Sequence, residues 1–160
     1  MGETIEWQEC EIDASQGMQI PPVHDNLVTA LSIDLERGTL ILKTRYQQMN
    51  QCEELTVLRF SGVLTHHFNH VMVPSILFDV ECQTIPTLLN EWEWLFLKQK
   101  NYGWPLSSWK TVSELEQQLS ERGLKMYRVR GSCGLDGFVM AEKVEFQMQT
   151  LDRENLPGID

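Results

Sequence analysis

The chain has 160 residues, of which 42% are hydrophobic and 22% are charged, as is usual for one soluble globular domain. Its formal net charge is −10, and residues 1–97 hold 14 acidic residues against 4 Lys/Arg. Negative potential repels phosphate backbones and anionic lipid, so this composition disfavours nucleic-acid and membrane-surface binding. No apolar run has the length of a membrane span and no secretory signal is recognisable, so we expect a cytoplasmic protein.

Residues 1–19 are interpreted as an N-terminal arm with a short strand near residues 5–12. After two prolines, apolar residues alternate with polar or smaller ones over residues 27–35 and again over residues 40–47. The sequence Glu36-Arg-Gly38 separates the two runs and is typical of a turn. Together they predict a β-hairpin with one face in a core.

Two further segments are rich in residues that favour β-structure, at residues 55–60 and 75–81. The first ends at Ser61-Gly62, where the glycine indicates a bulge or turn. Strict alternation in the second predicts that its apolar and acidic side chains face opposite sides. The apolar side would carry Ile76, Phe78 and Val80, and the other side Asp79 and Glu81.

The hydrophobic period then changes to that of a helix. Thr84 is a candidate N-cap, Pro86 suits the first turn, and the sequence from Asn101 to Pro105 ends the helix. The apolar stripe consists of Ile85, Leu88, Leu89, Trp92, Leu95 and Phe96.

A second helix is indicated by Thr111 or Ser113 as cap and Gly123 as stop. A strand over residues 124–130, a glycine-rich turn at 131–137 and a last strand over 138–148 follow. This order predicts an α+β fold: a mainly antiparallel sheet of about five to seven strands with two helices packed on one face. We expect a single domain over residues 1–150 and a flexible tail over residues 151–160.

Four cysteines are widely spaced and form no CxxC pair, which predicts reduced, mostly buried thiols rather than disulfides or metal ligands. They are Cys10, Cys52, Cys82 and Cys133.

The dipeptide His24-Asp25 has the form of the dyad used by metal phosphohydrolases. Those enzymes place the dyad on a helix, whereas here it lies between a Pro-Pro turn and a strand. We therefore expect a structural role, in which one of the two side chains accepts hydrogen bonds from turn amides.

The histidine cluster Thr65-His-His-Phe-Asn-His70 leaves two readings open. On a helix, His66 and His70 would share a face at the spacing that zinc ligands use. In an extended segment, His66 and His70 would lie on one side with Phe68, and His67 on the other. The corresponding alternative function is a metal-dependent enzyme that uses His66, His70 and His24. No serine or cysteine lies in a recognisable nucleophile motif, so we predict neither catalytic residues nor a cofactor.

Acidic and aromatic residues gather in the middle of the chain, and such residues on a surface favour binding of a basic protein partner. The predicted partner-binding residues are Asp79, Glu81, Glu91, Glu93, Trp94, Trp104 and Trp109. Two alternatives remain open: the tryptophans pack their loop onto the sheet, and the charge serves only solubility.

Residues 20–82 resemble bacterial immunity proteins of polymorphic toxin systems. The residues that carry the resemblance are Pro22, His24-Asp25, Val28, Leu40-Ile-Leu42, Leu58-Arg-Phe-Ser-Gly-Val63 and Ile76-Leu-Phe-Asp79. The resemblance implies a non-enzymatic protein that neutralises a toxin by binding it, and the acidic half of the chain suits a basic toxin. Besides the metal-dependent enzyme, a self-associating domain or homodimer is the other alternative.

Overall fold

The computed structural model describes residues 5–10, 23–47 and 52–152. Within them the chain forms an α+β fold with one nine-strand antiparallel sheet and three α-helices. The predicted α+β class is therefore confirmed. The sheet has more strands than the five to seven expected, and the fold has three α-helices instead of two. The strand order is β1-β9-β4-β3-β2-β6-β7-β8-β5. The elements are β1 (Gln8–Glu9), β2 (Leu27–Asp34), β3 (Thr39–Gln47), β4 (Cys52–Ser61), β5 (Thr65–Asn69), β6 (Ile76–Gln83), α1 (Ile85–Glu91), α2 (Glu93–Gln99), the short 3₁₀ helix η1 (Lys100–Tyr102), α3 (Val112–Glu121), β7 (Lys125–Cys133), β8 (Asp136–Ala141) and β9 (Lys143–Asp152).

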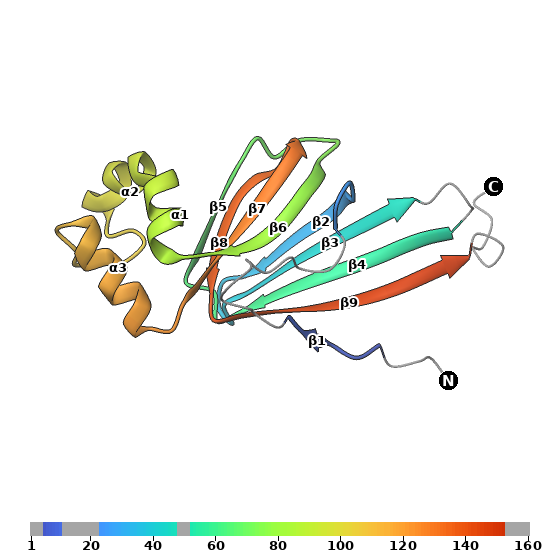
Figure 1. The fold of residues 1–160 in the computed structure, drawn as a ribbon, viewed down its shortest axis with the longest axis horizontal. Coiled ribbons are helices and arrows are strands. Elements are labelled where there is room, and N and C mark those ends of the chain that lie inside the picture. The colour runs from blue at the N-terminus through green and yellow to red at the C-terminus, as the bar shows by residue number, and fades with distance from the viewer. Residues whose placement is uncertain (1–4, 11–22, 48–51, 153–160) are drawn as a thin grey trace.

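The sheet bends back on itself, so its two halves face each other across a core (Figure 1). The strands β2 and β6 join the halves through a single residue pair, Leu27 with Ile76. Rings from strands that are not neighbours in the sheet meet in the core, because Phe60 of β4 lies 5.4 Å from Tyr127 of β7 in an edge-on contact. Leu58 of β4 and Val139 of β8 are fully buried in the same cluster. Burial of these apolar side chains is the main force that holds the halves together.

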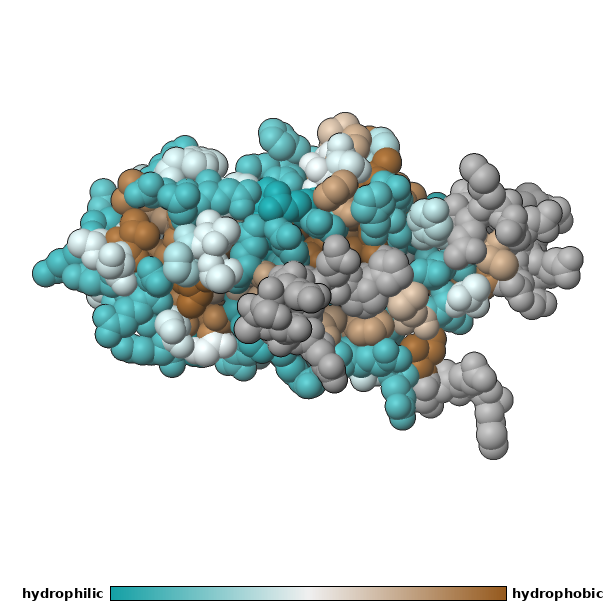
Figure 2. All heavy atoms as spheres, in the orientation of Figure 1, coloured by the Kyte–Doolittle hydropathy of each residue, from teal (hydrophilic) through white to brown (hydrophobic). Residues whose placement is uncertain are grey.

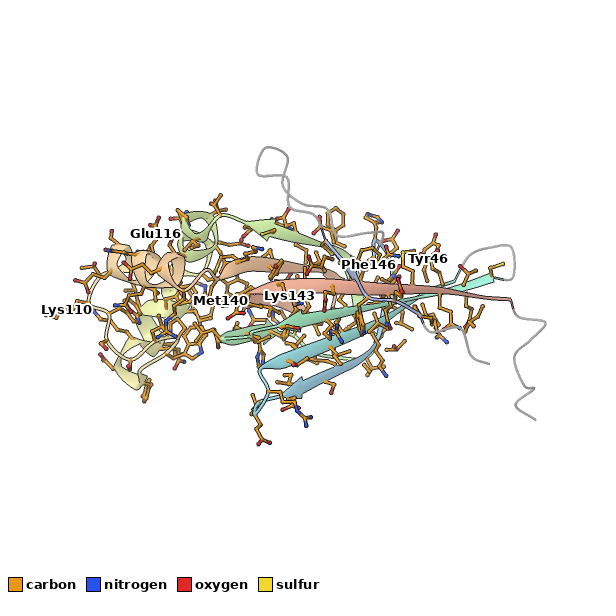
Figure 3. The ribbon with its side chains drawn as sticks, turned by 90° about the horizontal axis from the view of Figure 1, so that it is seen from below. Tyr46, Lys110, Glu116, Met140, Lys143 and Phe146 are labelled. Carbon is orange, nitrogen blue, oxygen red and sulfur yellow. The ribbon has the colours of Figure 1, made fainter. Side chains whose placement is uncertain are left out.

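The helices gather at one end of the molecule and cover the outer side of β7 and β8 (Figure 1). Met126, Phe138 and Met140 point out of the sheet into this second core, where Phe96 and Leu115 from the helices pack on them. Met140 lies at the helical end of the sheet in Figure 3. Because β7 and β8 are covered on both faces, nearly every residue of β8 is buried. Among the described residues, no helix combines the length and the hydrophobicity that crossing a bilayer requires.

The predicted helix after residue 84 exists but breaks in two at Trp92. Thr84 caps α1 by accepting a hydrogen bond from the Thr87 amide, and Thr111 caps α3 by accepting one from the Glu114 amide. The predicted apolar stripe is buried from Leu88 to Phe96, and Ile85 is partly buried against the same cluster. The break arises because Trp92 leaves helical geometry, with φ −112° and ψ 20°.

The segment around the histidine cluster forms an edge strand, β5, that the sequence pattern did not predict as a strand. The extended reading therefore applies: His66 and Phe68 lie on one side, with ring centroids 5.8 Å apart, and His67 lies on the other side. Pairing with β8 depends on Gly137, because a Cβ there would lie 1.8 Å from the carbonyl oxygen of His67. Two adjacent histidines and an asparagine hide the usual apolar alternation of a strand.

A β-bulge in β6 corrects the predicted facing of its side chains. Phe78 has no partner residue on β7, and the register shifts between Ile76 and Leu77 and again between Leu77 and Asp79. Leu77 and Val80 both point into the core, so Phe78 and Asp79 both point outward. Phe78 thus leaves the apolar side that strict alternation assigned to it and joins the acidic side.

The last strand, β9, runs to Asp152 and so extends two residues into the predicted tail. Residues 153–160 lie outside the described residues, as do residues 11–12 of the predicted N-terminal strand. Within that predicted strand, the structure has only the two-residue β1, which pairs with β9.

Leu58→Ala should lower the free energy of unfolding by about 2–5 kcal/mol, because it opens a cavity between the two halves of the sheet. The matched control is Leu35→Ala at the tip of the β2–β3 hairpin, where the side chain is 85% exposed. We expect that control to change stability by less than about 0.5 kcal/mol. Urea unfolding measures both, and equal midpoints would contradict face-to-face packing of the halves.

Candidate functional site

Carboxylates and guanidinium groups form a connected network on the outer side of β6, β7 and β8. We call it the carboxylate face and define it by Asp79, Glu81, Glu91, Asp136, Arg128 and Arg130. Figure 2 shows the most hydrophilic colour over β6 and β7, next to the helices. Residues 49 positions apart in sequence, Glu81 and Arg130, meet here because β6 and β7 are neighbours.

Arg128 is the buried centre of this network, with a side chain only 7% exposed. Its Nε donates to Glu91 at the end of α1 over 2.9 Å. Its Nη1 and Nη2 donate to both oxygens of Asp136 over 3.1 and 3.0 Å. Nη1 also donates to the carbonyl oxygens of Val129 and Gly137. A guanidinium can be buried only when its charge and its donors are matched in this way.

Arg130 is the more exposed of the two arginines and forms its hydrogen bonds with Glu81. Its Nε and Nη2 donate to Glu81 Oε1 over 3.0 and 2.6 Å. Gln83 donates to the same oxygen over 2.8 Å. Burial pushes the pKa of Glu81 upward, but these hydrogen bonds outweigh burial and lower its pKa overall.

Asp79 is the one carboxylate of the face that accepts no hydrogen bond from any described residue. Its Oδ1 lies 3.7 Å from Arg130 Nε, which is too long for a hydrogen bond. Partial burial and the nearby Glu81 carboxylate raise the pKa of Asp79. The charge of Asp79 is therefore the least compensated charge on this surface.

Two aromatic side chains are exposed beside the carboxylates. Phe78, on the bulge, is 47% exposed, and Trp94 of α2 is 55% exposed. Trp94 touches the network through Trp92, because the two indole rings lie 6.2 Å apart and the Trp92 ring lies 5.2 Å from the Arg128 guanidinium. The face thus combines negative charge with apolar contact area.

The other two predicted tryptophans belong to the interior of the helical end. Trp109 is 4% exposed, so its assignment to a partner-binding surface is corrected. Trp104 stacks on Phe96 at 5.3 Å and donates its indole N–H to Thr65 Oγ1, so most of its surface is used inside the protein. Trp104 and Trp109 therefore match the alternative prediction, in which the tryptophans pack their loop against the rest of the protein. Glu93 begins α2 and is exposed, and no described residue pairs with its carboxylate.

The histidines lie apart from any cluster with metal-binding geometry. Among the described residues, no group of three or more His, Cys, Asp or Glu side chains could hold a metal ion. His24 Nδ1 lies 3.1 Å from Asp25 Oδ2, and the His24 ring packs on Phe78. His66 lies on β5, and His70 follows that strand with a positive φ of 55°.

Among the described residues, the turn at His24-Asp25 is closed by backbone hydrogen bonds rather than by these two side chains, which corrects the predicted role of their polar atoms. The Asn26 amide donates to the Val23 carbonyl, and the Asp25 amide donates to the Leu77 carbonyl. The structural side chain is instead Asn26, which is buried and donates to Thr44 Oγ1 over 2.9 Å.

Cys10, Cys82 and Cys133 are free thiols, as expected, and Cys10, Cys52 and Cys82 are partly buried. Cys133 is exposed, in contrast to the expected burial. Burial raises the pKa of Cys10 to about 11 and also raises the pKa of Cys82, so neither forms a thiolate readily.

Sequence reasoning found Asp79, Glu81, Glu91 and Trp94 but missed Phe78 and three members of the network, namely Arg128, Arg130 and Asp136. The alternation along the strand Lys125-Met-Tyr-Arg-Val-Arg130 was the available signal, because it places Arg128 and Arg130 on the same side of the strand. Only the pairing of β7 with β6 shows that this side faces acids.

Comparisons with protein-family models, with curated proteins and with solved structures found no match. The resemblance of residues 20–82 to immunity proteins therefore stays a prediction that rests on the motifs quoted above.

Arg128→Lys should lower the free energy of unfolding by about 2–4 kcal/mol, because an ammonium group in this buried position cannot reach both Glu91 and Asp136 and leaves one of these partly exposed carboxylates without its donor. The same substitution at Arg130, on the same strand but more exposed, should cost less than about 1 kcal/mol. Urea denaturation of both variants tests this difference, and a similar loss in both would refute the central position of Arg128.

Asp79→Asn should raise the free energy of unfolding near pH 7 by about 0.5 kcal/mol, a small gain because solvent still screens the side chain. The pKa of Asp79 is higher in the folded chain than in the unfolded chain, so its ionisation opposes folding. Wild-type stability accordingly falls as pH rises through the range between those two pKa values. The advantage of the variant should therefore be absent near pH 3.5 and complete near pH 7, as measured by urea titrations. An equal advantage at both pH values would show that charge is not its cause.

Proposed function

We propose that this chain is a non-enzymatic binding protein, of the immunity type, that captures a basic protein partner with its carboxylate face. The observation that carries the proposal is the convergence of Asp79, Glu81 and Glu91 with the exposed rings of Phe78 and Trp94 on one surface. These residues come from β6, α1 and α2, and the sheet brings them together.

The charges on this surface suit a basic partner. Four carboxylates surround two guanidinium groups, so the network keeps an excess of negative charge, and Glu93 adds another carboxylate beside it. Excess charge of one sign attracts an oppositely charged partner before contact and speeds association. It repels nucleic acid and anionic membranes for the same reason.

The exposed rings supply what charge alone does not. Pairs of exposed charges contribute little net affinity, whereas aromatic side chains at the centre of an interface contribute much of it. Trp94 and Phe78 are large, have few rotatable bonds and lie at opposite sides of the arginine network. They therefore suit contact with apolar atoms of a partner at low entropic cost.

The arginines fix the geometry of the face before a partner arrives. Arg128 ties Glu91 on α1 to Asp136 on β8, and Arg130 holds Glu81. A surface whose side chains are already ordered loses less entropy on binding. The resemblance of residues 20–82 to immunity proteins supports the choice of a toxin as partner, and a basic nuclease-like toxin fits the charge.

Glu93→Lys should slow association with a basic partner about two- to fivefold at low salt, with a smaller effect on dissociation. The partner is sought by low-salt pull-down of proteins encoded beside this gene, and stopped-flow fluorescence then measures the association rate. Glu93 is preferable to Glu91, because reversal of Glu91 would also disturb Arg128.

The matched control is Glu36→Lys on the β2–β3 hairpin, which makes the same charge change outside the carboxylate face. We expect it to slow association less, and salt should reduce the difference between the two variants. Equal slowing by both variants would mean that only net charge matters. Absence of any basic partner retained at low salt would count against the proposed function as a whole.

A further inference from the structure

In the described part of the chain, an arginine twice lies over an aromatic ring while a carboxylate accepts hydrogen bonds from the same guanidinium. On the carboxylate face, Arg128 lies 5.2 Å from the centre of the Trp92 ring and donates to Glu91. On the outer side of the other half of the sheet, Arg59 lies 3.9 Å from the centre of the Trp7 ring and donates to Glu145 over 2.6 Å.

A third pairing of ring and carboxylate has no arginine over it. Phe78 and Asp79 are consecutive, and the bulge turns both outward. Consecutive Cα atoms are about 3.8 Å apart, so one guanidinium can reach both side chains. No described lysine or arginine lies over the Phe78 ring, and no described residue donates a hydrogen bond to Asp79.

The neighbouring basic side chains, Arg130 and His24, do not fill this position. Arg130 is directed to Glu81 and remains 3.7 Å from Asp79 Oδ1. His24 packs on Phe78 with ring centroids 5.0 Å apart at a tilt of 59°, while its Nδ1 faces Asp25. Phe78 still keeps 47% of its surface exposed, so the ring is accessible to a partner.

We propose that Phe78 and Asp79 form an anchor for an arginine side chain of the basic partner, completing a third arrangement of arginine, ring and carboxylate. This inference rests on the proposed function and specifies which partner residue the face recognises. The guanidinium lies against the Phe78 ring and donates to the Asp79 carboxylate.

Arginine suits this position better than lysine. Its planar guanidinium stacks on a ring, is weakly hydrated and can donate to Asp79 Oδ2 at the same time, whereas Asp79 Oδ1 is buried. A lysine ammonium offers a compact charge that is more strongly hydrated. The contribution of a cation over an exposed ring is about 0.5–1 kcal/mol, which corresponds to roughly two- to fivefold in affinity.

The test uses fluorescently labelled hexa-arginine and hexalysine peptides as probes, with binding measured by fluorescence anisotropy at low salt. We expect the wild-type protein to bind hexa-arginine about two- to fivefold more tightly than hexalysine. Phe78→Leu removes the ring but keeps an apolar side chain, so it should abolish this preference while hexalysine binding stays unchanged. Asp79→Asn should weaken binding of both peptides. Glu36→Gln is the control for loss of one carboxylate elsewhere.

Chemical-shift mapping with N-acetylarginine amide locates the site, and the largest shifts are expected at the backbone amides of Phe78 and Asp79. Circular dichroism and melting of each variant show that it folds as the wild-type protein does. If Phe78→Leu and Asp79→Asn bind hexa-arginine as the wild type does, while Glu93→Lys weakens it, the anchor is refuted and the proposed acidic docking surface stands. If the wild-type protein binds neither peptide at low salt, both proposals fail.

Discussion

A buried guanidinium connects the helical end of this molecule to its sheet. Arg128 is held from three directions, by Glu91 of α1, by Asp136 of β8 and by the ring of Trp92 at the helix break. An unpaired charge at this depth would cost several kcal/mol, so each partner is needed by the others. The positions of Trp92 and Trp94 follow from this network, because the helices can dock only where Glu91 reaches the arginine. The carboxylate face thus links the helices to the sheet and also forms part of the protein surface.

The bent sheet explains why an ion network is needed between the helices and the strands. The strands β7 and β8 contribute one face to the core shared with β3 and β4 and the opposite face to a second core shared with the helices. The second core covers only part of the outer side, and beyond it the strands carry Arg128, Arg130 and Asp136 instead of apolar residues. At that boundary an ion network replaces hydrophobic packing. The most strongly charged part of this half of the sheet therefore lies directly beside the helical core.

The sequence predicted the elements whose pattern is regular and local. The hairpin of β2 and β3, the stripe from Ile85 to Phe96 and the caps at Thr84 and Thr111 all follow from spacing along the chain. The edge strand β5 escaped prediction because His66, His67 and Asn69 give no apolar alternation. Phe78 was assigned to the apolar side of its strand because a bulge is a tertiary feature that local alternation does not record. The acids of the candidate site were found from their density, whereas their partner arginines belong to a distant, electrically neutral part of the chain and meet them only through strand pairing.

The pairing of β4 with β9 has a consequence for how the polypeptide acquires its shape during synthesis. Arg59 and Glu145, which pair across these strands, are separated by 86 positions, and β9 leaves the ribosome after every other strand of the described sheet. Until then β2, β3 and β4 can form a meander whose outer edge still lacks a neighbour. Long-range pairing of this kind is slow compared with local pairing, because a large loop must close first. A nascent chain therefore exposes a strand edge with unpaired backbone N–H and C=O groups, which can pair with other chains. Chaperones that shield such edges would have their greatest effect before β9 is synthesised.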